Sequence, residues 1–250
     1  MLSLRNSTRL ALDSIASSYG QKLSKELYLR IAIMQPYFLP YAGYFRLLQA
    51  TDLFVVYDCV QFTRRGWIHR NQLTNLENEA VWFTLPFTKA PQDIKINELS
   101  FANDAESRMQ EQIRKFPLFT TKKYLESEFN PLMLQFSSSV TVYITQLLKA
   151  VCDSLAIPFN VVYSSELNLP PHLKGQERIL AIANHFNADT YINAPGGREL
   201  YDEKTFSENG IQLQFLPPYN GSFQSILPRL MCEDTAALKN EILTQSYGIA

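Results

Sequence analysis

The residues best suited to chemistry lie in a tyrosine-rich loop that follows an apolar stretch, IAIMQPYFLPYAGYF at residues 31–45. Its hydrogen-bonding side chains are one amide and three phenols, which can donate and accept. Gly43 leaves the backbone open to a ligand, and free N–H groups at a helix start suit a phosphate or a carboxylate. The predicted roles are substrate binding for Gln35, Tyr37 and Gly43, and catalysis for Tyr41 and Tyr44. The alternative is that the rings only pack the loop onto the core.

A basic and aromatic stretch follows, RRGWIHRN at residues 64–71. No acidic residue lies between Asp58 and Glu77, so the local charge is positive. A guanidinium can clamp a diphosphate through paired N–H groups, and an indole can stack on a base or a sugar. The substrate-binding residues predicted here are Arg64, Trp67, Arg70 and Asn71. The alternative is a solvated basic edge strand that opposes aggregation.

A third candidate segment is YINAPGGRELY at residues 191–201, where an apolar strand runs into a Pro-Gly-Gly turn. Two adjacent glycines can turn their amides toward an anion as a backbone nest. We therefore predict that Asn193, Gly196 and Gly197 bind substrate. Gly-Gly turns are common, so this prediction depends on the turn lying beside the tyrosine-rich loop at the strand ends of one sheet.

Two single residues complete the candidate site. Asp58 ends the second predicted strand, where it could deprotonate an attacking amine, contact a ribose or cap the next turn. Ser225 opens a predicted helix, and its hydroxyl is expected to cap that helix, with phosphate binding as the alternative. No Ser-His-Asp or Cys-His order is recognisable, so acyl-enzyme chemistry has no positive support.

The elements that must position these residues alternate between strand and helix. We predict strands at 30–34, 53–58, 95–101, 159–167, 189–194 and 211–218, and helices at 42–50, 173–188 and 225–234. A hairpin of 67–74 with 80–87 forms an insertion at about 60–100. A helical middle covers about 103–156, with helices predicted at 103–116, 120–129 and 137–157, the last of them capped by its leading serines. The alternation predicts an α/β fold, with a Rossmann-like, mainly parallel sheet, helices on both faces and a β-hairpin insertion.

Composition limits the classes of function. The 250 residues are 46% hydrophobic, which favours a single domain over 30–250. A net charge of -1 gives no basic field, so nucleic acid is not an expected partner, although a tRNA that carries an aminoacyl group stays open. Three widely spaced cysteines and three scattered histidines form no metal motif and favour a reducing cytoplasm.

Two expectations concern membranes and the N-terminus. No apolar run reaches ~18 residues, so no transmembrane span is expected. Residues 1–29 lack the continuous apolar segment of a secretory signal, and we expect them to form a mobile extension. The oligomeric state stays open.

Several long motifs are similar to the WbqC-like family of bacterial proteins. The resemblance covers about 31–235 and is carried by IAIMQPYFLPYAGYF, DLFVVYDCVQFTRRGWIHRNQL, WFTLPF, YINAPGGRELY and FQSILPRLM. It implies a role in making O-antigen or other surface polysaccharides, as a transferase that modifies a nucleotide-linked amino sugar by glycyl, other aminoacyl or acyl transfer. The expected partners are a nucleotide-linked sugar and an aminoacyl donor. No cofactor is assigned beyond a candidate nucleotide or nucleotide sugar.

The chain departs from the family pattern at three places. It carries about thirty more residues before the first strand. The family often has Asn where His69 stands. The family's Ser-Ile-Ile-Asp reads Ser-Ile-Leu-Pro here, so Pro228 replaces an acid.

A fainter resemblance is to the HIGH-type nucleotidyltransferases. Tyr41-Ala42-Gly43-Tyr44 stands where they carry a histidine-glycine-histidine motif, and Ser225-Ile226 resembles their late serine motif. Tyrosine cannot supply the positive charge of an imidazolium to a leaving phosphate. Nucleotidyl transfer and non-catalytic binding of a nucleotide sugar or another anion therefore stand as alternatives to the transferase.

Overall fold

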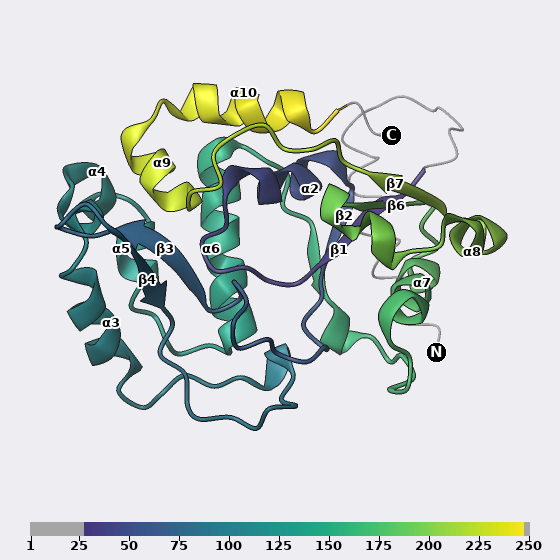
Figure 1. Cartoon of the computed structure of the whole chain (residues 1–250), viewed down its shortest axis with the longest axis horizontal. Coiled ribbons are helices and arrows are strands. Elements are labelled where there is room, and N and C mark those ends of the chain that lie inside the picture. The colour runs from purple at the N-terminus through teal and green to yellow at the C-terminus, as the bar shows by residue number, and fades with distance from the viewer. Residues whose placement is uncertain (1–27, 248–250) are drawn as a thin grey trace, which may run out of the picture.

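The computed structural model describes residues 28–247 and contains a five-stranded parallel sheet (Figure 1). Its strands are β1 (Arg30–Met34), β2 (Leu53–Val56), β5 (Val161–Tyr163), β6 (Thr190–Asn193) and β7 (Gln212–Phe215). They are arranged in the order β5-β2-β1-β6-β7, and every neighbouring pair is parallel. The prediction of a Rossmann-like parallel sheet is confirmed.

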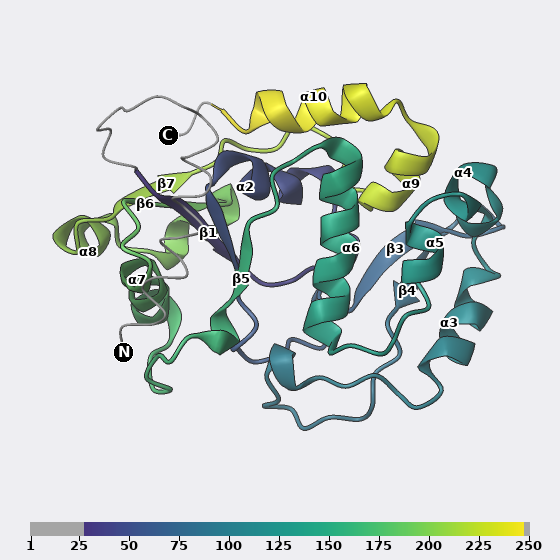
Figure 2. The same ribbon diagram turned by 180° about the vertical axis from the view of Figure 1, so that it is seen from behind.

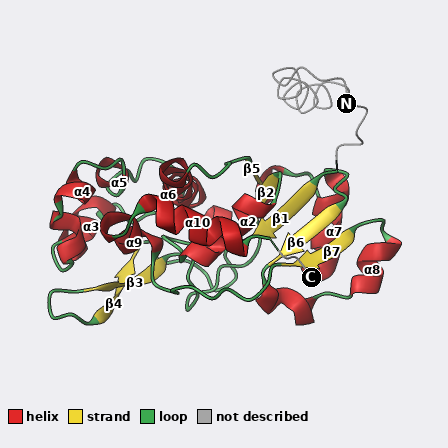
Figure 3. Cartoon of the chain, turned by 90° about the horizontal axis from the view of Figure 1, so that it is seen from above, coloured by secondary structure: helices red, strands yellow, loops and turns green. Residues whose placement is uncertain are grey.

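Helices cover both faces of this sheet, as the sequence predicted (Figure 3). Alternate residues of β1 point to opposite faces, so Ala32 packs with one apolar cluster while Ile31 and Ile33 pack with another. The first cluster contains residues of α2 (Phe45–Ala50), α6 (Val140–Leu155) and α10 (Thr235–Gln245). The second contains residues of α7 (Gly175–His185) and α8 (Glu203–Glu208).

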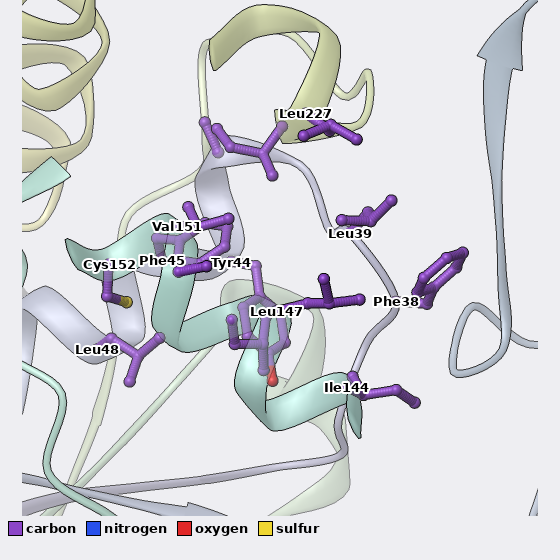
Figure 4. Packing of buried hydrophobic residues seen from close by; sticks show 14 of the residues in the cluster. Phe38, Leu39, Tyr44, Phe45, Leu48, Ile144, Leu147, Val151, Cys152 and Leu227 are labelled. Carbon is purple, nitrogen blue, oxygen red and sulfur yellow. The ribbon is translucent and has the colours of Figure 1, made fainter. Parts of the chain in front are cut away.

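Helix α6 connects the sheet to the rest of the molecule. Its apolar residues recur at spacings of three and four, which places them on one face of the helix. The hydroxyl of Ser139 caps its start by accepting from the N–H of Val142 at 3.3 Å. The helix ends at Ala156, which adopts a left-handed conformation with φ of 49°. Figure 4 shows this face packed against α2, with Leu39 and with Leu227 of α9 (Ile226–Cys232) in the same cluster.

The predicted insertion lies on the far side of α6 from the sheet (Figures 1 and 2). It contains the antiparallel hairpin of β3 (Arg70–Thr74) and β4 (Ala80–Thr84). Three helices follow it, namely α3 (Ala105–Ile113), α4 (Lys122–Leu125) and α5 (Phe129–Leu132). The helix expected at 120–129 is shorter in the structure, where α4 ends at Leu125 and a separate helix, α5, begins only at Phe129.

The strand predicted at 95–101 is wrong, since a 3-10 helix occupies Ile96–Glu98. Backbone bonds from other segments bend the chain there, because the N–H of Ile96 donates to Val60 O and that of Asn97 to Asp58 O. The carboxylate of Glu98 also accepts from the N–H of Lys95. The alternation of apolar residues in this segment predicted a strand, because it does not show that carbonyls of distant residues bind these N–H groups.

The C-terminal segment closes the fold with two helices, α9 and α10, of which only the first was predicted. Arg229 of α9 is buried and pairs with Glu233 at 2.8 Å and Glu241 at 2.7 Å. Helix α8 was also not predicted. Among residues 28–247, the structure contains no helix with the length and apolarity needed to cross a membrane.

The predicted extension at 1–29 lies almost wholly outside the described residues. Leu29 is described, and its N–H donates to the carboxylate of Asp189 at 2.7 Å. The chain is therefore tied to the sheet from the residue before β1 onward.

Candidate functional site

The sheet has one topological switch point, between β1 and β6. From β1 the chain continues to β2 and β5 on one side, whereas β6 leads to β7 on the other. In open parallel sheets, ligands bind outside the carboxyl ends of the strands at such a point. Gln35 follows β1 and Ala194 follows β6, so two of the predicted segments begin there.

A pocket of about 400 Å³ lies at this switch point. Its lining residues come from three segments: Met34, Gln35, Pro36, Tyr37, Tyr41, Gly43, Tyr44 and Leu47; Thr63, Gly66, Trp67 and Ile68; and Ala194. The structure thus brings the tyrosine-rich loop, the basic and aromatic stretch and the end of β6 around one cavity. We refer to it as the aromatic pocket.

The tyrosines of the aromatic pocket are neutral phenols. Burial raises the pKa of Tyr41 above the ordinary value of a phenol, and it raises the pKa of Tyr37 and of Tyr44 well above that value. The hydroxyl of Tyr44 donates to the backbone carbonyl of Gln35 at 2.9 Å. This hydrogen bond holds the loop and uses the hydroxyl proton of Tyr44. None of these groups can serve as a base near neutral pH, although a phenol can donate a hydrogen bond to a ligand.

Gly43 is required for close packing beneath the pocket. A Cβ added there would overlap the ring of Tyr41 and lie 2.8 Å from Cγ of Tyr219. Phe223 rests against Tyr41 with ring centroids 4.9 Å apart, yet 68% of Phe223 is exposed. Sequence reasoning missed both Tyr219 and Phe223. The available signal was that they follow another strand, β7, whose carboxyl end must lie at the same edge of the sheet.

Two predicted ligand-binding residues hold the loop instead of lining the pocket. The amide of Asn71 donates to the carbonyls of Phe38 at 3.2 Å and Leu39 at 2.5 Å. The hydroxyl of Ser225 donates to Leu39 O at 2.9 Å and makes no capping bond, so the expected cap is wrong. Both side chains are buried, and they stabilise Leu39 in a left-handed conformation with φ of 48°.

Asp58 does not line the aromatic pocket either. Its side chain accepts from the hydroxyl of Ser164 at 3.0 Å and from the N–H and hydroxyl of Ser165 at 2.9 and 2.7 Å. Only 2% of the residue is exposed. The carboxylate therefore joins the end of β2 to the end of β5, and this geometry does not favour the predicted role as a base.

The predicted arginines lie outside the pocket lining. The guanidinium of Arg70 lies over the ring of Trp82 at 4.1 Å and donates to the carbonyls of Gly66 and Arg65. Arg64 donates to the carbonyl of Ala90. The positive charge therefore lies beside the pocket, on the hairpin, and not within it.

The Pro-Gly-Gly segment forms a 3-10 helix at Pro195–Leu200, and neither glycine has a positive φ, so the predicted backbone nest does not form. Asn193 is buried, and its side-chain oxygen accepts from the N–H of Ala194 at 2.7 Å. A Cβ at Gly197 would lie 2.5 Å from Nδ2 of Asn193, whereas one at Gly196 would meet nothing within 4 Å. Of this segment, only Ala194 lines the pocket.

These positions limit the chemistry of the aromatic pocket. Among residues 28–247, none that carries a formal charge lines it, so it presents ring faces, backbone groups, the amide of Gln35 and the hydroxyl of Thr63. Such a surface suits an uncharged ring that carries hydroxyl or amide groups. Within residues 28–247, no three His, Cys, Asp or Glu side chains are grouped to hold a metal ion.

Comparison with known proteins identifies a family and a curated relative. The chain is 26% identical to the uncharacterized protein Rv1507c of Mycobacterium tuberculosis over 196 residues, which is 77% of this chain and 83% of that protein. No solved structure matches the chain. The model of the WbqC-like protein family matches residues 35–226, from the first residue of the pocket loop to the start of α9. The match covers well over half of the sequence, and the chain therefore belongs to the WbqC-like protein family.

Proposed function

We propose that the protein is a transferase that modifies a nucleotide-activated amino sugar in surface-polysaccharide biosynthesis, by glycyl, other aminoacyl or acyl transfer. Family membership supports the link to polysaccharide biosynthesis. The observation that carries the proposal is the uncharged, tyrosine- and tryptophan-lined pocket at the switch point of a parallel sheet. In this proposal the pocket takes the sugar.

A sugar ring matches the pocket better than a phosphate does. Trp67 lines the pocket with 44% of the residue exposed, and its ring centroid lies 5.8 Å from that of Tyr37. Ring faces can pack against the C–H face of a sugar, while Gln35 and Thr63 are available to its hydroxyl or amide groups. Burying a phosphate without a cation would be costly.

Catalysis in this proposal comes mainly from positioning. The amine nitrogen of the sugar attacks the carbonyl carbon of an activated acyl donor, and the bond to the donor's leaving group breaks. The proton lost by nitrogen passes to solvent. Holding an amine against an activated acyl group can supply a large share of the acceleration. A phenol such as that of Tyr41 can donate a hydrogen bond to the developing oxyanion.

Binding without turnover is the second candidate, and one observation favours it. In the part of the chain that the structure describes, tyrosines are the only ionisable side chains that line the aromatic pocket, so none of these residues offers a general base to a bound ligand. Nucleotidyl transfer gains no such support, because no histidine or lysine of the described residues lines the pocket.

Fluorescence can test binding, since the chain has two tryptophans, Trp67 and Trp82. In a Trp82→Phe variant, Trp67 alone reports on the pocket. We expect nucleotide-linked amino sugars to change its emission, and Tyr37→Ala to weaken that binding by about tenfold through loss of ring contact. Leu200→Ala is the control, because Leu200 is 69% exposed and does not line the pocket.

Mass spectrometry then tests turnover. With aminoacyl or acyl donors present, a transferase yields a sugar nucleotide heavier by the acyl group. Binding without any such product would favour the second candidate. If no nucleotide sugar or free amino sugar changes the emission of Trp67, the assignment of the pocket is wrong.

A further inference from the structure

A second pocket, of about 460 Å³, lies beside the hairpin. The residues that matter for its chemistry are Leu76, Trp82, Arg114, Lys115 and Phe116. It opens between the hairpin turn and the C-terminal end of α3. We refer to it as the hairpin pocket.

The walls of the hairpin pocket are held together by hydrogen bonds. Gln112 of α3 accepts from the N–H of Thr84 at 3.0 Å and donates to its carbonyl at 2.8 Å. The N–H of Leu76 donates to the carbonyl of Lys115 at 3.2 Å. These bonds join both ends of the pocket, so its shape is set before any ligand binds.

Two tryptophans connect the hairpin pocket to the aromatic pocket. Trp67 lines the aromatic pocket and Trp82 lines the hairpin pocket, and their ring centroids are 5.2 Å apart. Each is more than 40% exposed, at 44% and 42%. Two neighbouring half-exposed indoles form a stacking surface, which is how proteins commonly hold nucleobases.

Charge differs sharply between the two pockets. The described residues that line the aromatic pocket are all uncharged, whereas Arg114 and Lys115 line the hairpin pocket and Arg70 lies over Trp82. One acid, Glu77, is in the lining of the hairpin pocket. Lys115 also pairs loosely with Glu111 at 4.0 Å, and both side chains are more than half exposed. Such an exposed pair is weak and leaves the lysine available to an anion.

From this separation we infer that the hairpin pocket binds the nucleoside diphosphate part of a nucleotide sugar whose sugar lies in the aromatic pocket. The base packs on the part of the Trp82 ring that Arg70 leaves exposed, and the phosphates lie against Arg114 and Lys115. A neutral sugar site adjoining a cationic stacking site matches the two halves of such a molecule. This inference rests on the proposed function for the identity of the sugar, but not for the binding of the nucleotide.

Single-tryptophan variants separate the two sites. Trp67→Phe leaves Trp82 as the reporter of the hairpin pocket, and Trp82→Phe leaves Trp67 as the reporter of the aromatic pocket. Each is titrated with uridine, cytidine, thymidine and guanosine diphosphates and, separately, with free N-acetylated amino sugars. We expect at least one nucleoside diphosphate to change the emission of Trp82, and free sugars to change that of Trp67 alone.

Charge removal supplies the second measurement. Arg114→Gln with Lys115→Gln should weaken binding of the nucleoside diphosphate by about tenfold or more and reduce its salt dependence, because charge-assisted hydrogen bonds are lost. Sugar binding should not change. The matched control is Lys204→Gln, which removes a charge from α8, where 81% of the lysine side chain is exposed.

The outcomes distinguish this inference from the proposed function. The inference is overturned if no nucleoside diphosphate changes the emission of Trp82, or if the Arg114 and Lys115 changes leave its affinity intact. In either case sugar binding at Trp67 would still support the proposed function. Nucleotide binding at Trp82 without any sugar binding would instead support the hairpin pocket and reject the sugar assignment.

Discussion

Replacement of Gly43 by alanine tests whether the pocket depends on close ring packing. The added Cβ would lie 2.8 Å from Cγ of Tyr219 and 2.9 Å from its Cδ1, and would overlap the ring of Tyr41. Ordinary contact begins at 3.4 Å, so the Tyr219 ring must move by at least 0.6 Å, the difference from 2.8 Å. That ring is not free to move, because its hydroxyl is bonded to Glu241 and Arg229.

Overpacking of this kind costs about 1–3 kcal/mol. The better helix propensity of alanine offsets part of this, by about 0.5–1 kcal/mol. Because the bonds of its hydroxyl hold the Tyr219 ring in place, we expect a cost of about 2–3 kcal/mol and a net fall of about 1–2.5 kcal/mol in the free energy of unfolding of Gly43→Ala. For a chain of this size, that corresponds to a fall in Tm of roughly 2–10 °C.

Urea unfolding and thermal melting measure this effect. Gly196→Ala is the matched control, since Gly196 also lies in a 3-10 helix and an added Cβ would meet nothing within 4 Å. We expect that variant to be at least as stable as the parent, because alanine gains helix propensity there without a clash. Equal stability of Gly43→Ala and Gly196→Ala would refute the packing argument. The added Cβ also displaces the ring of Tyr41, so unchanged ligand affinity in Gly43→Ala would show that Tyr41 does not contact the ligand.

Three further changes test the roles assigned to buried polar groups. Asp58→Asn should lower stability by about 1.5–3 kcal/mol in urea unfolding, through loss of charge-assisted bonds, and leave ligand affinity unchanged; loss of turnover at full stability would restore the catalytic role. Burial lowers the pKa of His69 to about 4, below its unfolded value of about 6.5, so stability should fall as pH drops from 6.5 to 4. His69→Asn should flatten this part of the pH profile of the urea midpoint. An unchanged slope would show that His69 does not cause the loss of stability. Arg229→Met should cost about 2–4 kcal/mol by leaving Glu241 unpaired, and a smaller loss would show that solvent screens the pair. Arg229 lowers the pKa of Glu241, so the contribution of the pair is present above pH ~4.5 and is lost as pH falls.

Local sequence patterns predicted the main elements well. The strands at the start of the domain and in its last third, the hairpin and helix α6 all lie near their expected positions. These elements depend on apolar periodicity and on caps such as Ser139, which a short window of sequence contains. Ile96–Glu98 was mistaken for a strand because its backbone bonds come from Val60 and Asp58, far along the chain.

The candidate site was predicted in outline and revised in detail. Gln35, Tyr37, Gly43 and Trp67 line one pocket, together with Tyr41 and Tyr44. The sequence predicts this grouping, because the loops that follow parallel strands lie at the same edge of the sheet. The role of a single residue depends on where its side chain points, and the sequence does not show this. Asn71 and Ser225 donate to backbone carbonyls of the loop. The carboxylate of Asp58 accepts from Ser164 and Ser165.

The amino-acid order alone determined the class of fold, the family and the three segments that meet at the strand ends, because periodicity, turn residues and motif spacing are local properties. The tertiary structure alone decided where the charge lies. It set Arg70 over Trp82 and turned Arg64 toward the carbonyl of Ala90, so that neither arginine lines the aromatic pocket. Backbone carbonyls from nearby loops accept from both guanidiniums. A guanidinium binds whichever acceptor the fold brings within reach, and that choice is made by packing between distant segments.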